Sequence, residues 1–326
     1  MKLRLALLSL LCAACSSTGP SLEREPAPDA EQRARDVRAA DEKRRDFQAV
    51  LVRLDQSLDS YVQALSNQGQ VRADRQVEQL AKSIRDTVLD LGPTGYGASA
   101  PPTEAGANFG LLQAAAADGS DPNRQAIALA ALGFSGRTDL MPLIVQGAQL
   151  EDPFRVDHAV LGLAVLRAPT TPPGVLAAIA ERRNHPEDGR VQAAWALYEI
   201  QQVNTDQAPF AAIWRRWLGE ARDELPIGVL VSAVRGLGLS RSADDAKLVA
   251  PMLKHPTPRL RMAAAIALAR MNAQDYAPDL IDLLGPQETV PNVRLHARKA
   301  LADLAGGQDH GYDVAAWHKV FERAAR

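Results

Sequence analysis

The chain has 326 residues, of which 46% are hydrophobic, so it is long and apolar enough to bury a sizeable core. Its 37 Lys and Arg nearly balance its 39 Asp and Glu, and the net charge is -2. The chain therefore lacks the overall basic excess that would bind a polyanion, and no nucleic-acid partner is expected. Its 2 cysteines both precede residue 16, which excludes a disulfide, a thiol nucleophile or a thiolate metal site from the remaining chain.

Residues 1–15 have the composition of a secretory signal. A cationic start leads into an apolar run that is shorter than the roughly 20 residues a membrane span needs. Two alanines stand directly before Cys15, and this start resembles the bacterial lipoprotein signal, in which such a cysteine is lipidated and becomes the N-terminus. The resemblance implies a lipid anchor at Cys15, and Ser16 is typical of sorting to the outer membrane. The alternative is a plain secretory signal that is cut near Ala14.

Residues 16–29 are rich in Ser, Pro, Glu and Ala and predict a disordered tether. Residues 30–91 predict two amphipathic helices joined by a short turn. Closure within the chain would make a helical hairpin, whereas pairing with a second chain would make a coiled coil. The apolar seam of the first helix comprises Val37, Ala40, Phe47, Leu51, Leu54, Leu58, Tyr61 and Leu65. Residues 92–106 are dense in Gly and Pro and predict a linker.

From residue 107 to the end the chain repeats itself. Each repeated segment closes with a leucine that has a small residue four places before it and Ala or Gly directly before it. Residues four apart share one face of a helix, and small side chains let a neighbouring helix approach closely. The closing leucines are Leu132, Leu163, Leu197, Leu237, Leu268 and Leu301.

Further amphipathic segments separate these helices, so each repeat predicts a helix pair. A single pair cannot bury its own apolar face. We therefore expect an all-α fold, in which residues 107–326 stack into a right-handed α-solenoid of about six pairs behind the N-terminal hairpin.

Two of the segments, Thr257–Leu268 and Pro291–Leu301, carry the pattern Pro-x-x-Arg-x-x-Ala-x-x-Ala-Leu. This pattern resembles the HEAT-like repeats of the phycobilisome lyase type. In that family the arginine helps to hold consecutive repeats together, and the matching residues are Arg190, Arg261 and Arg294. The resemblance implies the solenoid and leaves the activity open, because this scaffold serves binding and enzyme functions alike.

The sequence contains no constellation typical of catalysis. None of the 6 histidines has the spacing of a zinc motif, and close pairs of carboxylates stand at predicted helix starts, where they act as caps. We therefore expect no catalytic residue, no metal ligand and no cofactor. Adjacent basic residues indicate solvated faces rather than a DNA-binding stripe.

The third repeat concentrates aromatic side chains. Trp195, Tyr198, Trp214 and Trp217 lie there together with Arg215, a composition typical of a binding hot spot. Tryptophan at helical spacing also fills cores whose neighbours are alanine-rich. The sequence leaves both readings open, core packing and contact with a protein partner.

These features predict a HEAT-repeat lipoprotein of a Gram-negative cell envelope, held at the outer membrane by its N-terminal lipid and facing the periplasm. We expect a scaffold that binds a protein partner and performs no catalysis. The alternative is a HEAT-like enzyme or lyase-type protein that holds a small molecule or chromophore in the solenoid groove.

Overall fold

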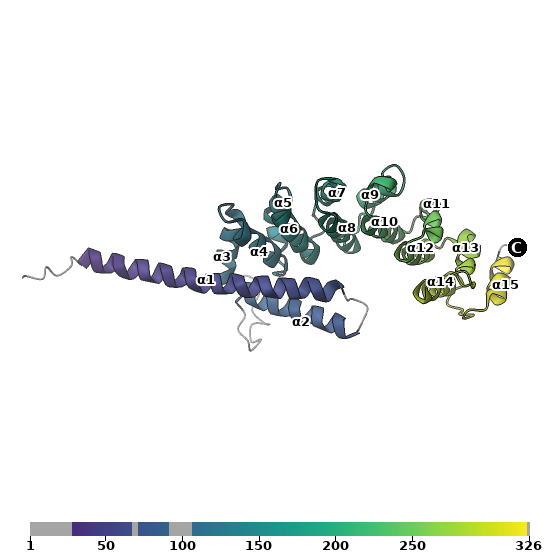
Figure 1. The fold of residues 1–326 in the computed structure, drawn as a ribbon, viewed down its shortest axis with the longest axis horizontal. Coiled ribbons are helices and arrows are strands. Elements are labelled where there is room, and N and C mark those ends of the chain that lie inside the picture. Colours follow the sequence, from purple (N-terminus) through teal and green to yellow (C-terminus); the bar gives the residue numbers. More distant parts are fainter. Residues whose placement is uncertain (1–27, 67–70, 91–105, 325–326) are drawn as a thin grey trace, which may run out of the picture. The chain divides into compact units, whose positions relative to one another are not determined.

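The computed structural model describes residues 28–66, 71–90 and 106–324, and every regular element in these ranges is a helix (Figure 1). The predicted lipoprotein signal at residues 1–15 with its Cys15, nearly all of the predicted tether and nearly all of the predicted linker lie outside the described residues. The chain divides into two compact units, residues 1–46 and residues 47–326.

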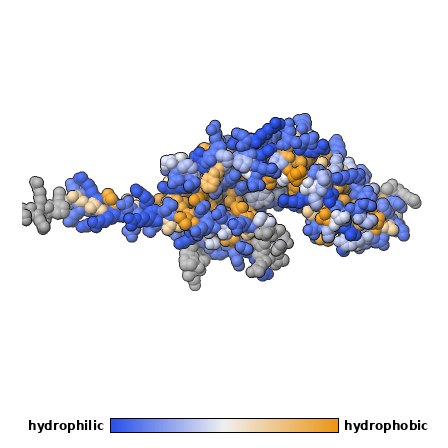
Figure 2. Space-filling view, viewed as in Figure 1, coloured by the Kyte–Doolittle hydropathy of each residue, from blue (hydrophilic) through white to orange (hydrophobic). Residues whose placement is uncertain are grey.

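The first unit contains the N-terminal half of α1 (Pro28–Ser66). Residues 29–46 are all exposed, and Figure 2 shows a mostly hydrophilic surface over this segment. Ion pairs one turn apart, such as Arg35 with Glu31 at 3.2 Å, support a helix that has little packing. Val37 of the predicted seam is 61% exposed. The seam is therefore buried only in its second half.

The second unit begins inside α1 at Phe47. From this residue the seam joins the same hydrophobic core as α2 (Val71–Val88) and the first repeats. Ile84 and Val88 of α2 are fully buried in that core. The two helices form the predicted hairpin within one chain.

Six helix pairs and a closing helix follow. In each pair an outer helix precedes an inner helix, and Figure 1 shows α5, α7, α9, α11 and α13 in one row and the inner helices in a second row along the inner side of the arc. The inner helices pack against one another in chain order. The pairs are α3 (Ala107–Ala117) and α4 (Pro122–Gly133), α5 (Met141–Ala148) and α6 (Pro153–Leu166), α7 (Pro173–Glu181) and α8 (Glu187–Gln202), α9 (Ala208–Leu218) and α10 (Ile227–Ser240), α11 (Ala246–Val249) and α12 (Pro258–Arg270), and α13 (Ala277–Asp282) and α14 (Pro291–Leu304), before α15 (Val314–Ala324).

Short 3-10 helices complete the turns of the array. The longest, η4 (Ala250–Lys254), continues α11. The others precede helices α5, α10, α11 and α13, namely η1 (Thr138–Leu140), η2 (Arg222–Glu224), η3 (Ala243–Asp245) and η5 (Gln274–Tyr276). Among the helices of the described part of the chain, none combines the length and the apolar content that a membrane span requires.

The repeat pattern explains why the inner helices pack so closely. All six closing leucines have no exposed surface, and the alanines four places before them are buried equally. Gly162 shows how near two inner helices come, because a Cβ there would lie 2.5 Å from the carbonyl oxygen of Leu129 on α4. Pro at the first turn opens helices such as α4, where the Asp121 side chain accepts hydrogen bonds from two backbone amides. The predicted all-α array of six helix pairs is confirmed.

The arginines that the family resemblance singled out contact neighbouring repeats. Arg190 donates to the backbone oxygen of Glu224, which belongs to the next repeat, at 3.4 Å. Arg261 pairs with the carboxylate of Glu288 in the next repeat at 2.7 Å. Arg294 lies over an aromatic ring in the segment after the last pair, with its guanidinium carbon 5.1 Å from the ring centroid. Each arginine therefore links its own helix to the segment that follows.

Candidate functional site

The second half of α1 covers the inner helices of the first repeats. The ring of Tyr61 meets that of Phe134, at the end of α4, edge to face with centroids 5.0 Å apart. Near the other end of α4, the Arg124 guanidinium lies 5.0 Å from the ring centroid of Phe47. Burial raises the pKa of the Tyr61 phenol, an effect that the nearby Arg167 opposes and Glu199 reinforces. This part of α1 therefore reaches across α4 and α6 to the edge of α8.

Beyond α1 the inner surface is open. It presents two aromatic, three basic and two aliphatic side chains from three successive inner helices, which we call the inner patch. α10 packs against both α8 and α12, so these side chains lie on neighbouring rows. The members of the inner patch are Trp195 and Tyr198 of α8, Arg235 of α10, and Arg259, Met262, Ile266 and Arg270 of α12, all exposed or half-buried.

Helical spacing places the two α8 residues of the inner patch on one face of α8, and its four α12 residues on one face of α12. Trp195 and Tyr198 are three residues apart, and the four α12 residues follow one another at intervals of three, four and four. Both aromatic side chains pack with one side against the core, which fixes their orientation. The two aromatic members of the inner patch are therefore held in place by packing.

The arginines of the inner patch have no carboxylate partner among the described residues. Arg235, Arg259 and Arg270 make neither an ion pair nor a hydrogen bond in the described ranges. Burial lowers the pKa of the Arg235 guanidinium; Tyr198 opposes this effect, and the two other arginines add to it. Positive charge is thus concentrated here, and the nearby Glu199 carboxylate offsets it only weakly at Arg235.

The structure places two of the predicted partner-binding residues in the core. Trp214 and Trp217 on α9 have 0% exposure, and their rings meet edge to face with centroids 5.0 Å apart. The indole nitrogen of Trp214 donates to Gln201 Oε1 at 2.8 Å, and that of Trp217 donates to Glu181 Oε1 at 2.6 Å. A partner cannot reach either ring, so the predicted binding role does not extend to these two residues.

Arg215 of the predicted cluster lies on the outer helix α9. Its Nε and Nη2 atoms donate to the two carboxylate oxygens of Asp245 at 2.7 and 2.9 Å, and this hydrogen bonding raises the pKa of Arg215. Asp245 belongs to the next repeat, so Arg215 joins two repeats instead of pointing to the inner surface. Of the predicted cluster, Trp195 and Tyr198 alone lie in the inner patch.

Sequence reasoning missed the basic and aliphatic members of the inner patch. Arg235 had a detectable signal, because it is the one charged residue in the apolar helix Ile227–Ser240. An isolated arginine in such a helix marks a position that faces away from the core. Arg259 had no such signal, since Arg261 lies two residues away, and Arg270 stands in the last turn of its helix, where a basic residue is common.

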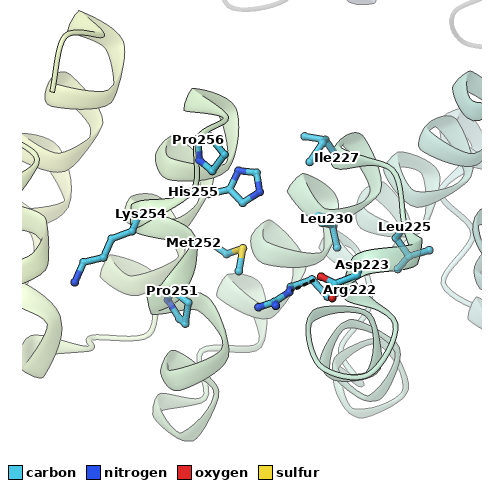
Figure 3. Close-up of a pocket in the computed structure, with 10 residues that line it drawn as sticks. All are labelled: Arg222, Asp223, Leu225, Ile227, Leu230, Pro251, Met252, Lys254, His255 and Pro256. Carbon is cyan, nitrogen blue, oxygen red and sulfur yellow. Dashed lines mark hydrogen bonds and ion pairs between the residues drawn. The ribbon is translucent and has the colours of Figure 1, made fainter.

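A hollow between the fourth and fifth pairs is the candidate for small-molecule binding. Its volume is about 430 Å³, and its lining includes Met252, Lys254 and His255 (Figure 3). The Lys254 side chain points away from the hollow and pairs with Asp279 at 2.9 Å. His255 accepts a hydrogen bond from the Thr257 amide through Nδ1 at 3.0 Å. Arg222 and Asp223 also line the hollow, but they pair with each other at 3.2 Å. Few polar groups are therefore left for a ligand in this hollow, and a specific small-molecule site needs several.

Within the described ranges, no group of three or more His, Cys, Asp or Glu side chains is arranged to hold a metal ion. The inner patch also contains no nucleophilic side chain next to a general base. Its polar members are three arginines and one phenol.

Comparison with known proteins agrees with the repeat architecture. The family model for HEAT repeats matches residues 217–302. A search of curated proteins found no match.

Three solved structures illustrate the similarity. The complex of CpcE and CpcF of phycocyanin lyase from Nostoc sp. is 18% identical, with 75% of this chain and 93% of that chain covered and a TM-score of 0.37. A Kap121p mutant is 12% identical, with 78% of this chain but 33% of that chain covered and a TM-score of 0.39. Human deoxyhypusine hydroxylase in complex with glycerol is 14% identical, with 85% and 96% covered and a TM-score of 0.28. Residues 217–302 thus match the model of HEAT repeats, and they lie within the array of helix pairs.

Proposed function

We propose that the protein is a membrane-anchored, non-enzymatic scaffold of the cell envelope that binds a protein partner on its inner patch. The observation that carries this proposal is the contrast along the inner helices. The chain's own α1 covers the inner surface of the first repeats, whereas the inner patch is open and presents aromatic, aliphatic and arginine side chains. Aromatic residues and arginine dominate the binding energy of protein interfaces.

The proposed anchor is a lipid on Cys15, which would hold the protein at the outer membrane, facing the periplasm. The support is the sequence at the N-terminus, where two alanines precede the cysteine. Lipid chains contribute about 0.8 kcal/mol for each buried CH₂ group, so an acylated cysteine would retain the protein without a membrane-spanning helix.

Fractionation of cells tests the anchor. Cys15→Ala should move the protein from the membrane fraction to the periplasmic fraction, because the acceptor of the lipid is lost. Cys12→Ala is the matched control, since it removes the other cysteine of the signal, and it should leave the protein in the membrane fraction. Membrane association of the Cys15→Ala protein would reject the anchor.

Site-specific crosslinking tests the binding surface. A photo-crosslinking amino acid at position 198, in place of the half-buried Tyr198, should form one adduct of defined mass in intact cells. The matched control is the same amino acid in place of Lys247, an exposed residue on the outer helix α11, which should form none. Equal crosslinking from both positions would contradict a partner on the inner helices.

A further inference from the structure

We infer that the inner patch binds an acidic polypeptide segment in which apolar side chains separate the carboxylates. The inference rests on the proposed function, since it names the chemistry of the partner at the same surface. The charge, the spacing and the apolar content of the inner patch all favour such a segment.

Charge is the first part of the argument. Several arginines elsewhere in the repeats are paired with carboxylates, as Arg215 is with Asp245 and Arg261 is with Glu288. The arginines of the inner patch have no such partner in the described part of the chain. Guanidinium groups bind carboxylates through two parallel hydrogen bonds, and a partially dehydrated guanidinium gains most from such a partner. A carboxylate from another molecule would supply the missing compensation.

The spacing of the arginines on α12 also favours such a segment. Arg259 and Arg270 are 11 residues apart on α12 (270 - 259), which corresponds to roughly 16 Å at 1.5 Å per residue. An extended peptide rises about 3.3 Å per residue, so carboxylates four to six residues apart match this distance. Met262 and Ile266 lie between the two arginines on the same helix face. The matching peptide therefore carries apolar residues between two acidic positions.

The apolar residues of the inner patch also favour a polypeptide over a nucleic acid as its partner. A phosphate backbone requires continuous positive charge, whereas the aliphatic residues of the inner patch interrupt its arginines. Glu199, beside Tyr198, is paired with Arg167, and its carboxylate has the smallest of the influences on the pKa of Arg235.

Fluorescence anisotropy on the purified full chain tests the inference. The probe is a labelled peptide in which Leu-Phe-Leu separates two Glu-Glu pairs. The comparison probes are the same peptide with Gln for each Glu, the same peptide with Ser for each apolar residue, and a single-stranded oligonucleotide. We expect the acidic peptide to bind at least roughly tenfold more tightly than either altered peptide and to bind less tightly as salt concentration rises.

Paired charge reversals locate the binding surface. The double variant Arg259→Glu with Arg270→Glu should weaken binding of the acidic peptide roughly tenfold or more. Its control is Lys247→Glu with Lys319→Glu, which makes the same change in net charge at exposed residues of α11 and α15. Both double variants should keep the parent melting temperature, because all four side chains are exposed.

Each contrary result has a distinct meaning. Equal binding of the Glu and Gln peptides, an unchanged affinity in the α12 double variant, or tighter binding of the oligonucleotide would overturn the inference. If a partner crosslinks at position 198 and the α12 double variant does not weaken its capture, the proposed function stands and the inference fails. If no partner crosslinks there but the acidic peptide binds as expected, the inference stands and the proposed function fails.

Discussion

Arg261 and Glu288 join the fifth and sixth helix pairs through two parallel hydrogen bonds, from Nε to Oε2 at 2.7 Å and from Nη2 to Oε1 at 2.9 Å. The two side chains are 14% and 6% exposed. Arg261 also donates to the backbone oxygen of His255 at 2.8 Å, and Glu288 accepts from the amide of Val290 at 2.9 Å. The pair thereby fixes the segment before α12 to the segment before α14.

Glu288→Ala should lower the free energy of unfolding by about 3–5 kcal/mol, because it leaves a buried guanidinium without its carboxylate. Urea unfolding followed by circular dichroism measures the change. The control is Lys254→Ala, which removes an ion pair whose lysine is 76% exposed and should cost less than about 1 kcal/mol. Losses of similar size in the two variants would contradict the special role of the buried pair.

The same carboxylate predicts a dependence of stability on pH. Burial acts to raise the pKa of Glu288, but hydrogen bonds from Arg261 and the Val290 amide outweigh it and leave the pKa below 4.5. A group whose pKa is lower in the folded state contributes its full stabilisation above the unfolded pKa and loses it as pH falls through the folded pKa. The stability difference between the parent and Glu288→Gln should therefore be constant from pH 7 to about pH 5 and shrink below. Urea unfolding at a series of pH values measures it, and a constant difference down to pH 3 would contradict the assignment.

The repeat face is the part of the fold that local sequence could predict. Leu237, Ala233 and Gly236 recur at fixed spacing on α10, as their counterparts do on the other inner helices, and all are buried. Period and side-chain size determine which side of each helix meets its neighbour, and both can be read from a few consecutive residues. The order of helix pairs follows because each pair packs on the next.

The candidate site depended on contacts between distant residues, which the sequence could not supply. Trp217 finds its hydrogen-bond partner Glu181 at a separation of 36 residues, and Arg215 finds Asp245 at a separation of 30. Local composition makes Trp217 and Trp195 equivalent, although one lies in the core and the other on the inner surface. Trp217 belongs to the outer row of helices and Trp195 to the inner row. This difference in position becomes visible only in the packed array.

Gly236→Ala should destabilise the protein by about 1–3 kcal/mol, because the added Cβ would lie 2.3 Å from Trp214 Nε1. The displaced indole would also lose its hydrogen bond to Gln201. Thermal unfolding followed by tryptophan fluorescence measures the effect. The control is Gly174→Ala on α7, where a Cβ meets nothing within 4 Å. Because alanine favours the helix, this variant should match the parent or gain up to about 1 kcal/mol, and a comparable loss there would contradict the steric explanation.

Trp214→Ala and Trp195→Ala should separate stability from binding. Trp214 is fully buried, so its truncation should cost about 3–5 kcal/mol of unfolding free energy. Trp195 packs against the core on one side and is open on the other, so its truncation should cost clearly less but weaken binding of the acidic peptide several-fold. Urea unfolding and anisotropy on the same preparations measure both effects. A larger stability loss from Trp195→Ala than from Trp214→Ala, or unchanged peptide affinity in folded Trp195→Ala, would contradict the division between a core tryptophan and an inner-patch tryptophan.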